Sequence, residues 1–348
     1  MAAKLKAFTG PGAERQAERA GHWLKSLAGI NQSRDWCAKN GVTLTKAETE
    51  TIGTSGGFLV PIGFDDAIIA VRDTVAAFRN AEVRPAGSDN TVRPRRTGGL
   101  TANFVAEGSV IPESQIQFDA ISATLKKLAI LTRSSAELFE DSAPDLAEFL
   151  ATEIGYAFAA VEDDCGFNGD GTSGFGGIAG LSMKLTGTKS AINAAAGHNT
   201  FLTLDTTDLA NLMAGVLATG IPGAAWYTSA VGYAQCFCRI AATAGGLVAT
   251  ETADGTIKAS FLGFPVRFSS KLPNVSTTLS GKPMIYFGDL SKSSVIVEHR
   301  IGTSIVMSRE RAFDQDQVLL RGTRREDIIS HSVGDATTLG PIAMLVGN

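Results

Sequence analysis

One long helical pattern near the middle of the chain limits the possible folds most strongly. It runs from about Pro144 to Phe167, and its apolar residues recur at three- and four-residue steps, as on one face of an α-helix. Ser142 is a suitable N-cap, and Gly169 marks the exit. At 1.5 Å per residue, about 24 residues make a rod of about 36 Å. The predicted apolar face consists of Leu146, Phe149, Leu150, Ile154, Ala157, Phe158, Val161 and Cys165.

Between residues 83 and 132, the pattern changes from helical spacing to alternation. Alternating apolar residues over 101–105 and 118–125 predict two paired strands, with a polar tip at 107–114 between them. A two-stranded arm of this kind is only marginally stable by itself. We therefore expect the arm to project from the fold and to need another surface to lie on.

The rest of the chain predicts short helices and strands of a mixed α/β arrangement. Helices are predicted at 13–28, at about 63–78 and at 204–217, the last capped by Asp205 or Thr206. A buried strand at 224–227 leads into another helix, which carries Tyr233 and Cys236. Further strands are predicted at 264–268, 284–287, 294–298, 303–308, 317–324 and 342–346.

Composition excludes several classes of protein. The chain has 31 Lys and Arg against 35 Asp and Glu, and this net charge of −4 excludes a globally basic nucleic-acid binder. Charged residues make up 19%, below the roughly 25% of an average soluble domain, which indicates apolar surface that neighbouring chains cover. The sequence lacks an apolar run of about 18 residues and an N-terminal signal peptide. We therefore expect self-association, synthesis in the cytosol and no membrane contact.

No motif predicts catalysis. Residues 53–57 fit the G-x-S-x-G pattern around Ser55, but a polar arm precedes them and an extended segment follows, where a hydrolase needs a strand and a helix. Residues 168–174 are rich in glycine but lack the Gly-Lys-Ser/Thr ending of a phosphate loop, so we interpret them as the turn that ends the long helix. We predict that the chain is not an enzyme. A serine hydrolase using Ser55 is the least favoured alternative.

The four cysteines are too sparse for a disulfide scaffold. Cys37, Cys165, Cys236 and Cys238 form no C-x-x-C pair, and the Cys236-Phe-Cys238 pair lacks the further ligands that zinc needs. We expect reduced, mostly buried thiols, with no metal and no cofactor.

The order of the predicted parts is more specific than any part alone. A polar arm, a Gly-Gly-Phe-Leu-Val-Pro joint, a hairpin with a Glu-Gly-x-x-x-Pro-Glu-Ser tip, a long helix and a glycine-rich exit follow one another. This order resembles the HK97-like major capsid proteins of tailed bacteriophages, from about residue 50 to the C-terminus. The matching segments are 56–61, 104–108 with 111–114, 126–129 with 134–138, and 167–172 with 177–178, followed by weaker matches at 262–266, 287–289 and 306–310.

The resemblance implies an α+β fold made of an N-arm, an extended β-hairpin (the E-loop), a P-domain with the long spine helix, and an A-domain. In such a fold the E-loop lies over a neighbouring subunit and needs no core of its own. We also expect the segment from Ala2 to about Gly53 to be ordered only by contacts with other subunits, because its isolated amphipathic fragments cannot bury their apolar faces within the chain. The implied boundaries are 1–60 for the N-arm, 61–84 for the first part of the P-domain, 85–125 for the E-loop, 126–190 for the P-domain with the spine helix, 191–290 for the A-domain, 291–335 for the P-domain strands, and 336–348 for a C-terminal strand that returns to the A-domain.

The function that the resemblance implies is structural. It implies a major capsid protein that self-assembles as hexamers and pentamers into an icosahedral shell around double-stranded DNA, which it contacts without sequence specificity. The implied partners are other copies of the chain and a portal protein, with scaffolding and decoration proteins left open, and assembly takes place in the host bacterial cytoplasm. The runner-up is an encapsulin-type nanocompartment, which encloses protein cargo. The separate polar N-arm and the long E-loop favour the phage.

Charged residues on the E-loop and near the spine helix are the candidates for contacts between subunits. Arg93, Arg95 and Arg96 form the densest basic run in the chain, for which a solvated strand is the alternative interpretation. Ile111 stands where the family member with covalent chainmail has its isopeptide lysine, so we expect no cross-link at this site. The acidic candidates are Glu107 and Glu113 at the tip, and Glu137, Glu140, Asp141 and Glu148 around the start of the spine helix.

Overall fold

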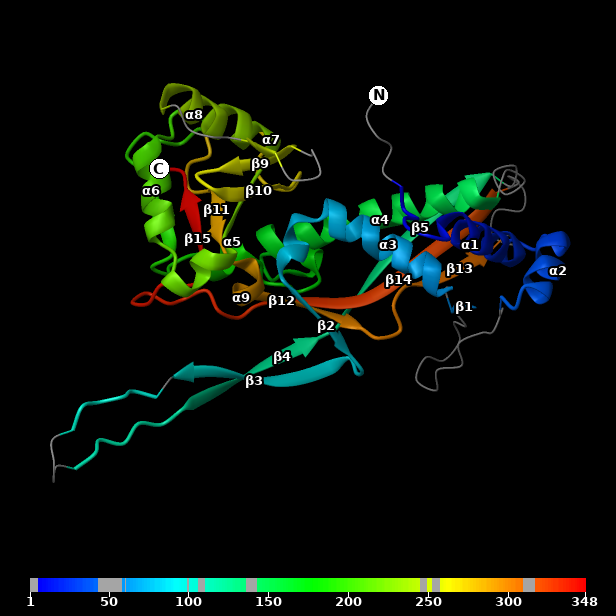
Figure 1. Cartoon of the computed structure of the whole chain (residues 1–348), viewed down its shortest axis with the longest axis horizontal. Helices are drawn as coiled ribbons and strands as arrows, with labels where there is room; N and C mark the ends of the chain where they lie inside the picture. Colours follow the sequence, from blue (N-terminus) through cyan, green and yellow to red (C-terminus); the bar gives the residue numbers. More distant parts are fainter. Residues whose placement is uncertain are drawn as a thin grey trace.

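The chain forms an elongated α+β body from which a two-stranded arm projects (Figure 1). The computed structural model describes residues 6–42, 58–59, 61–98, 100–105, 110–135, 143–244, 249–251, 257–308 and 317–348. Within these residues, one β-sheet lies beneath a layer of helices and a second sheet forms a separate lobe at the opposite end of the body.

A six-stranded sheet is organised around one long central strand, β14 (Gln317–Ser330). β5 (Lys126–Ser135) pairs with β14 in antiparallel register over ten residues, from Gln317 opposite Ser135 to Glu326 opposite Lys126. β14 also pairs with β13 and β12, which continue to β1 and β2 respectively. The bounds of these strands are β1 (Phe58–Leu59), β2 (Glu82–Ala86), β12 (Ser294–His299) and β13 (Ser304–Ser308).

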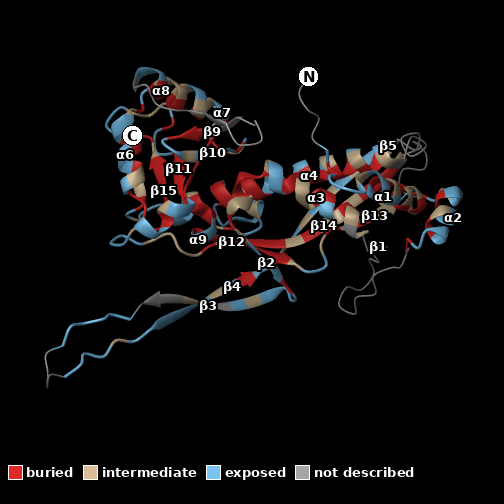
Figure 2. Ribbon diagram, viewed as in Figure 1, coloured by how far each residue is buried: buried red, intermediate tan, exposed pale blue. Residues whose placement is uncertain are grey.

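Helices cover one face of this sheet and form the first hydrophobic core with it. The longest is α4 (Ala143–Asn168), on which α1 (Ala13–Leu27) and α3 (Ile62–Val75) pack, while α2 (Asn31–Lys39) packs on α1. The approach of α3 to α4 is close, since a Cβ atom added to Gly155 would lie 2.7 Å from a methyl carbon of Val71. Burial of the helix faces toward the sheet is visible in Figure 2.

A seven-stranded sheet forms the second lobe. Its centre is aromatic: Trp226 lies against Phe237, Phe261 and Phe287, and its indole Nε1 donates a hydrogen bond to the carbonyl oxygen of Phe261 at 3.0 Å. The strand order is β6 (Ala191–Asn193), β15 (Ile342–Val346), β11 (Pro283–Gly288), β7 (Ala225–Thr228), β10 (Phe264–Phe268), β9 (Ile257–Phe261) and β8 (Ala249–Glu251). The C-terminal strand β15 is therefore part of this lobe.

Short helical segments complete the body, and a third core connects the two sheets. That core contains Phe78, Phe167, Tyr227, Tyr286 and Ile328, so side chains from both sheets contribute to it. The short segments are η1 (Ala77–Asn80), η3 (Ser173–Phe175), α5 (Leu181–Leu185), α6 (Thr206–Ala214), η4 (Ala218–Gly223), α7 (Ala230–Gly232), a π-helical turn η5 (Tyr233–Cys238), α8 (Arg239–Ala244) and α9 (Leu290–Ser293).

Most predicted elements are confirmed. The spine helix is α4, and six predicted strands from 264–268 to 342–346 correspond to β10, β11, β12, β13, β14 and β15. Asp205 caps α6 as predicted, and its side chain accepts a hydrogen bond from the Asp208 amide at 2.9 Å. Among the described residues, no helix has the length and apolar character needed to span a bilayer.

Three predictions about packing are wrong. The fragments within 6–42 bury their apolar faces inside the chain, because α1 lies on α4 and places Trp23 and Leu24 in the first core with no exposed surface. Residues 101–105 form no strand, since no partner strand continues the ladder there. The predicted face of the spine helix is too wide: Phe149, Ala157 and Val161 point to solvent instead of to the sheet.

Candidate assembly surfaces

The projecting arm is a hairpin whose outer part exposes large apolar side chains. β3 (Asn90–Gly98) and β4 (Gln117–Thr124) pair in antiparallel register, whereas residues 100–105 and 110–116 extend beyond the ladder (Figure 1). The exposed fraction is 109% for Phe104, 92% for Val110 and 74% for Ile111. Leu100, Ile116 and Phe118 are exposed on the same arm. A contiguous run of exposed apolar side chains is typical of a surface that another protein covers.

The root of the arm is held to the body by polar and apolar contacts. The Asp327 carboxylate accepts a hydrogen bond from the Thr124 amide at 2.9 Å. Ala123 and Leu125 pack with Val295 and Val297 in a small core of their own. The arm is therefore anchored at its base, and its outer part is joined by the hydrogen bond that the Thr101 amide donates to the Ser114 hydroxyl at 3.2 Å, while its large apolar side chains stay exposed.

The basic run predicted to contact a neighbouring subunit lies on β3. Of its side chains, the structure describes that of Arg95, whose guanidinium donates to Asp119 of β4 at 2.9 Å and to the carbonyl oxygen of His331. Burial lowers the pKa of His331, and the positive charge of Arg95 lowers it further. Arg95 therefore has partners within its own chain, and a contact of Arg93, Arg95 or Arg96 with another subunit stays a prediction.

The predicted acidic partners are only partly visible. Glu113 is exposed on the arm, and the Glu148 carboxylate of α4 accepts a hydrogen bond from the Ala7 amide at 2.8 Å. Ile111 is exposed near the tip, as its predicted place in the hairpin requires. Glu107, Glu137, Glu140 and Asp141 lie outside the described residues, as does Ser55 of the alternative hydrolase motif.

A buried network of charges fixes the helices to the six-stranded sheet. Its guanidinium groups belong to Arg72 of α3, Arg79 of η1 and Arg324 of β14, and its carboxylates to Glu162 of α4, Glu298 of β12 and Glu326 of β14. We call these six residues the charge hub.

The central member of the charge hub is Arg72, whose side chain is fully buried. Its Nη2 donates to Glu298 at 3.0 Å and to Glu326 at 2.9 Å, and it also contacts Glu162. Burial, which has the largest effect, and the nearby Arg324 together lower the pKa of Arg72 to about 10, against the attraction of the carboxylates. Burial alone would raise the pKa of Glu298, but Arg324 and the other two arginines outweigh it and hold that pKa at about 2.

Sequence reasoning missed the charge hub. Its signal was present, because Arg72 interrupts the apolar side of α3 and Glu298 ends the apolar run of β12. Charges at such positions are almost never fully buried unless they are paired. The carboxylate partners of Arg72 lie 90, 226 and 254 residues from it along the chain, so spacing in the sequence could not identify them.

Asp163 of α4 connects the two lobes. Its carboxylate accepts hydrogen bonds from the Phe78 amide at 2.8 Å, the Ala77 amide at 3.3 Å and the Ser269 hydroxyl, which follows β10, at 2.5 Å. Burial raises the pKa of Asp163, although these hydrogen bonds act in the opposite direction. One buried carboxylate thus joins α4, η1 and the seven-stranded lobe.

Within the described part of the chain, two groups of side chains have the composition of a metal site, and both have other roles. The oxygen atoms of Glu162, Glu298 and Glu326 lie close together, but the guanidinium groups of the charge hub already bind them. His198 contacts Asp208 at 2.6 Å, and Asp208 forms the capping box of α6 with Asp205. These carboxylates are therefore engaged in structural hydrogen bonds.

The thiols are buried, as predicted, with Cys238 half-buried. Burial raises the pKa of Cys165 to about 11 and that of Cys236 to about 12, so both thiols stay protonated near neutral pH. A protonated, enclosed thiol is a poor nucleophile and a poor metal ligand.

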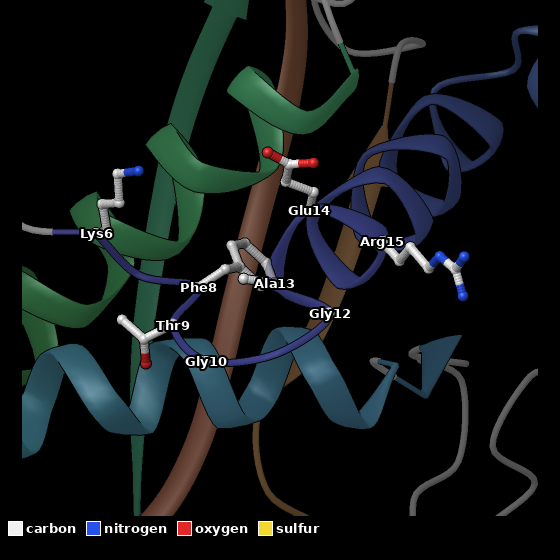
Figure 3. A pocket seen from close by; sticks show the side chains of 8 residues that line it. All are labelled: Lys6, Phe8, Thr9, Gly10, Gly12, Ala13, Glu14 and Arg15. Carbon is white, nitrogen blue, oxygen red and sulfur yellow. The ribbon is translucent and has the colours of Figure 1, made fainter.

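An open pocket of about 710 Å³ lies where the N-terminal segment crosses the helices (Figure 3). Phe8 anchors this segment in the first core, where its ring lies 6.3 Å from that of Phe64. The lining carries both signs of charge, from Lys6, Arg15 and Glu14, and favours no class of ligand. The pocket follows from the way that the segment before α1 is fixed over α3 and α4.

Comparison with known proteins identifies the family. The model of the phage capsid family matches residues 56–328. The major capsid protein of Enterobacteria phage HK97 is 26% identical over 195 residues, which cover 53% of this chain and 48% of that protein. The match thus spans about half the length of this relative.

Solved structures extend the likeness to nearly the whole chain. A structure from Mycobacterium phage Bobi has a TM-score of 0.57 at 14% identity, covering 90% of this chain and 98% of its own. The capsid of the native GTA particle has a TM-score of 0.53 at 20% identity, covering 89% and 97%. At these identities the likeness shows a shared HK97-like fold. Because the family model matches well over half of its residues, the chain belongs to the phage capsid family.

Proposed function

We propose that the chain is a major capsid protein that self-assembles as hexamers and pentamers into an icosahedral shell enclosing double-stranded DNA. The observation that carries this proposal is the arm, whose exposed apolar outer residues have no partner among the described residues of their own chain. Family membership supports the shell as the assembly in which the arm is covered. The arm of each copy then lies over a neighbouring copy.

The proposed function assigns each region of the chain to one part of a capsid protein. Residues 1–60 are the N-arm, 85–125 the E-loop, 191–290 with 336–348 the A-domain, and the remainder the P-domain. A portal protein, with scaffolding and decoration proteins where they take part, completes the particle in the bacterial cytoplasm. The relatives are structural capsid proteins, and we assign this chain no enzymatic activity.

Electron microscopy of the purified protein tests the proposal. We expect closed shells in negative stain, and shells from infected or induced cells should contain nuclease-protected double-stranded DNA. A uniformly monomeric protein would contradict the shell. Shells that enclose only protein would support the encapsulin-type alternative instead.

The proposed shell is held by non-covalent contacts, because Ile111 cannot form an isopeptide bond. Boiled and reduced particles should therefore run on a denaturing gel as one band near 36.3 kDa. A ladder of multimers would show that another pair of residues forms a cross-link.

A further inference from the structure

A cavity lies between the root of the arm and the six-stranded sheet. Its volume is about 330 Å³, at the lower end of the range for small-molecule sites. Residues of β3 and β4 line it from the arm, and residues of β2, β12, β14 and α9 line it from the body. Figure 1 shows this junction, where the arm leaves the body beside β2. The cavity is formed within one chain and does not depend on assembly.

The wall on the sheet side is apolar. Val295 and Val297 of β12 are 7% and 3% exposed, and they pack with Ala123 of β4. Ile329 of β14, which lies opposite Val295 in the ladder, and Ile121 of β4 are half-buried and line the same cavity. Apolar side chains around such a cavity favour an occupant with a hydrocarbon part, because it removes their surface from water.

The described part of the lining carries more positive than negative charge. It contains one acidic residue, Glu82, and three basic ones, Arg84, Arg95 and Lys292. Glu82 pairs with Arg84 at 2.6 Å. The acidic partners of the other two cations, Asp119 and Asp289, lie outside the lining, at 2.9 Å and 3.3 Å. An anion is therefore the charged group that the cavity favours.

Two polar atoms of the lining residues are enclosed and have no hydrogen-bond partner among the described residues. They are Nε of Arg95 and Nδ1 of His331. Burial lowers the pKa of His331, and the positive charges of Arg95 and Arg84 lower it further, against the effect of Glu82. The potential around the imidazole is therefore positive. Enclosed polar atoms of this kind are ordinarily satisfied by a bound water or a ligand.

We propose that this cavity binds a small amphipathic carboxylate, with its hydrocarbon part against Ile121, Val297 and Ile329 and its carboxylate near Arg84 and Arg95. At about 30 Å³ for each water molecule, the volume corresponds to about eleven non-hydrogen atoms, which is close to the size of octanoate. A guanidinium can bind a carboxylate through two parallel hydrogen bonds. Because the two walls belong to the arm root and the body, the bound molecule holds them together.

Titration calorimetry of the full-length chain with sodium octanoate tests the proposal. We expect saturable binding, with an affinity that rises about fourfold for each methylene group from hexanoate to octanoate. 1-Octanol has the same hydrocarbon part without the carboxylate, and should bind about tenfold more weakly. A lack of saturable octanoate binding overturns the proposal, as does an equal affinity for 1-octanol.

Four variants test whether the cavity is the binding site. Ile121→Trp fills the cavity and should abolish octanoate binding. The matched control, Val92→Trp, adds the same side chain to the same hairpin at a position that is 66% exposed and outside the lining, and should leave binding unchanged. Glu82→Gln should strengthen octanoate binding about two- to fivefold and Arg84→Gln should weaken it by a similar factor, with no change for 1-octanol. Circular dichroism checks that each variant folds.

Hydrogen exchange of the full-length chain locates the bound molecule. Octanoate should slow the exchange of amides in β4 and β12, the two walls of the cavity, and should leave the seven-stranded lobe unchanged. Slower exchange confined to residues 100–105 and 110–116 would show that octanoate coats the exposed outer arm, and the proposal would then be wrong. Wild-type binding by Ile121→Trp would also contradict it.

Discussion

The charge hub and the outer arm deal with their unfavourable groups in opposite ways. The charge hub buries six ionisable side chains and pairs each with groups of opposite type within the same chain. The outer arm leaves Phe104, Val110 and Ile111 in water, although the burial of each would favour folding by about 1.5–3 kcal/mol. The comparison teaches that the body satisfies its buried charges within one chain, whereas the outer arm leaves apolar surface that the proposed shell would cover.

Shortening the arm should have the largest effect, because it removes the exposed apolar residues and leaves the body unchanged. Replacing residues 99–116 by Asn-Gly joins Gly98 to Gln117, which already pair at the end of the ladder, through a two-residue turn. We expect the variant to remain a folded monomer and to form no shells, because the apolar outer arm is absent. Size-exclusion chromatography and circular dichroism measure the two properties separately. Shells of normal size from this variant would show that the arm is not required.

Arg72→Met should cause the next largest effect, and it acts on the body. Removing this guanidinium leaves the buried Glu162, Glu298 and Glu326 without their shared partner, which costs about 3–5 kcal/mol of unfolding free energy. Urea unfolding of the shortened-arm monomer, followed by tryptophan fluorescence, measures the loss. As a control, Lys184→Met removes an exposed cation and should change the stability little.

The fall of the unfolding free energy at acid pH should depend on the ionisation of Glu298. Its pKa in the folded state is about 2, below the ordinary value of 4.5, so the ionised carboxylate stabilises the fold above about pH 4.5. This contribution, about 3 kcal/mol by linkage, is lost as the pH falls through 2. Glu298→Gln should lower the unfolding free energy at pH 7 and flatten its decline between pH 4.5 and 2. An unchanged acid limb would show that Glu298 is not held ionised by the charge hub.

The smallest effect is expected at the basic run of β3. Replacing Arg93, Arg95 and Arg96 by Ala should raise the salt sensitivity of shell formation or lower the yield of shells. The effect should be small, because each exposed pair contributes only about 0.2–1 kcal/mol. Arg95→Ala alone loses its contact with Asp119 and should cause a part of this change. The yield of shells across a series of NaCl concentrations measures it. Equal yields for the triple variant and the wild type at every concentration would favour the solvated-strand interpretation.

Local sequence patterns predicted the helices, caps and strands, because these features depend on residues that are close together in the sequence. The spine helix, the Asp205 cap and the strands after residue 260 follow from spacing and capping chemistry, and the structure has them. Packing between distant segments was not predictable in this way. Trp23 reads as part of an isolated amphipathic fragment, and it is fully buried only because α4 and α3 provide the other half of its core.

The candidate surfaces were predictable to a smaller degree. Alternation identified the hairpin but overestimated its ladder, because residues 101–105 alternate without a partner strand. The basic run on β3 was visible, whereas the exposed pair of Leu131 and Arg321 was not, since these residues lie opposite each other only through the register of β5 and β14. Such a surface requires the pairing of strands that lie nearly two hundred residues apart.

The projection of the arm to one side of the body has a consequence for the symmetry of the proposed shell. If each arm lies on a different surface of the next copy, the contact is heterologous, so a row of copies has one uncovered arm at one end and one uncovered receiving surface at the other. Such a row stops growing only when the two ends meet, and a small change in the angle between neighbours alters how many copies close the ring. In the proposed shell, five-fold and six-fold rings then use one chain and one kind of contact and differ only in the angle between neighbours.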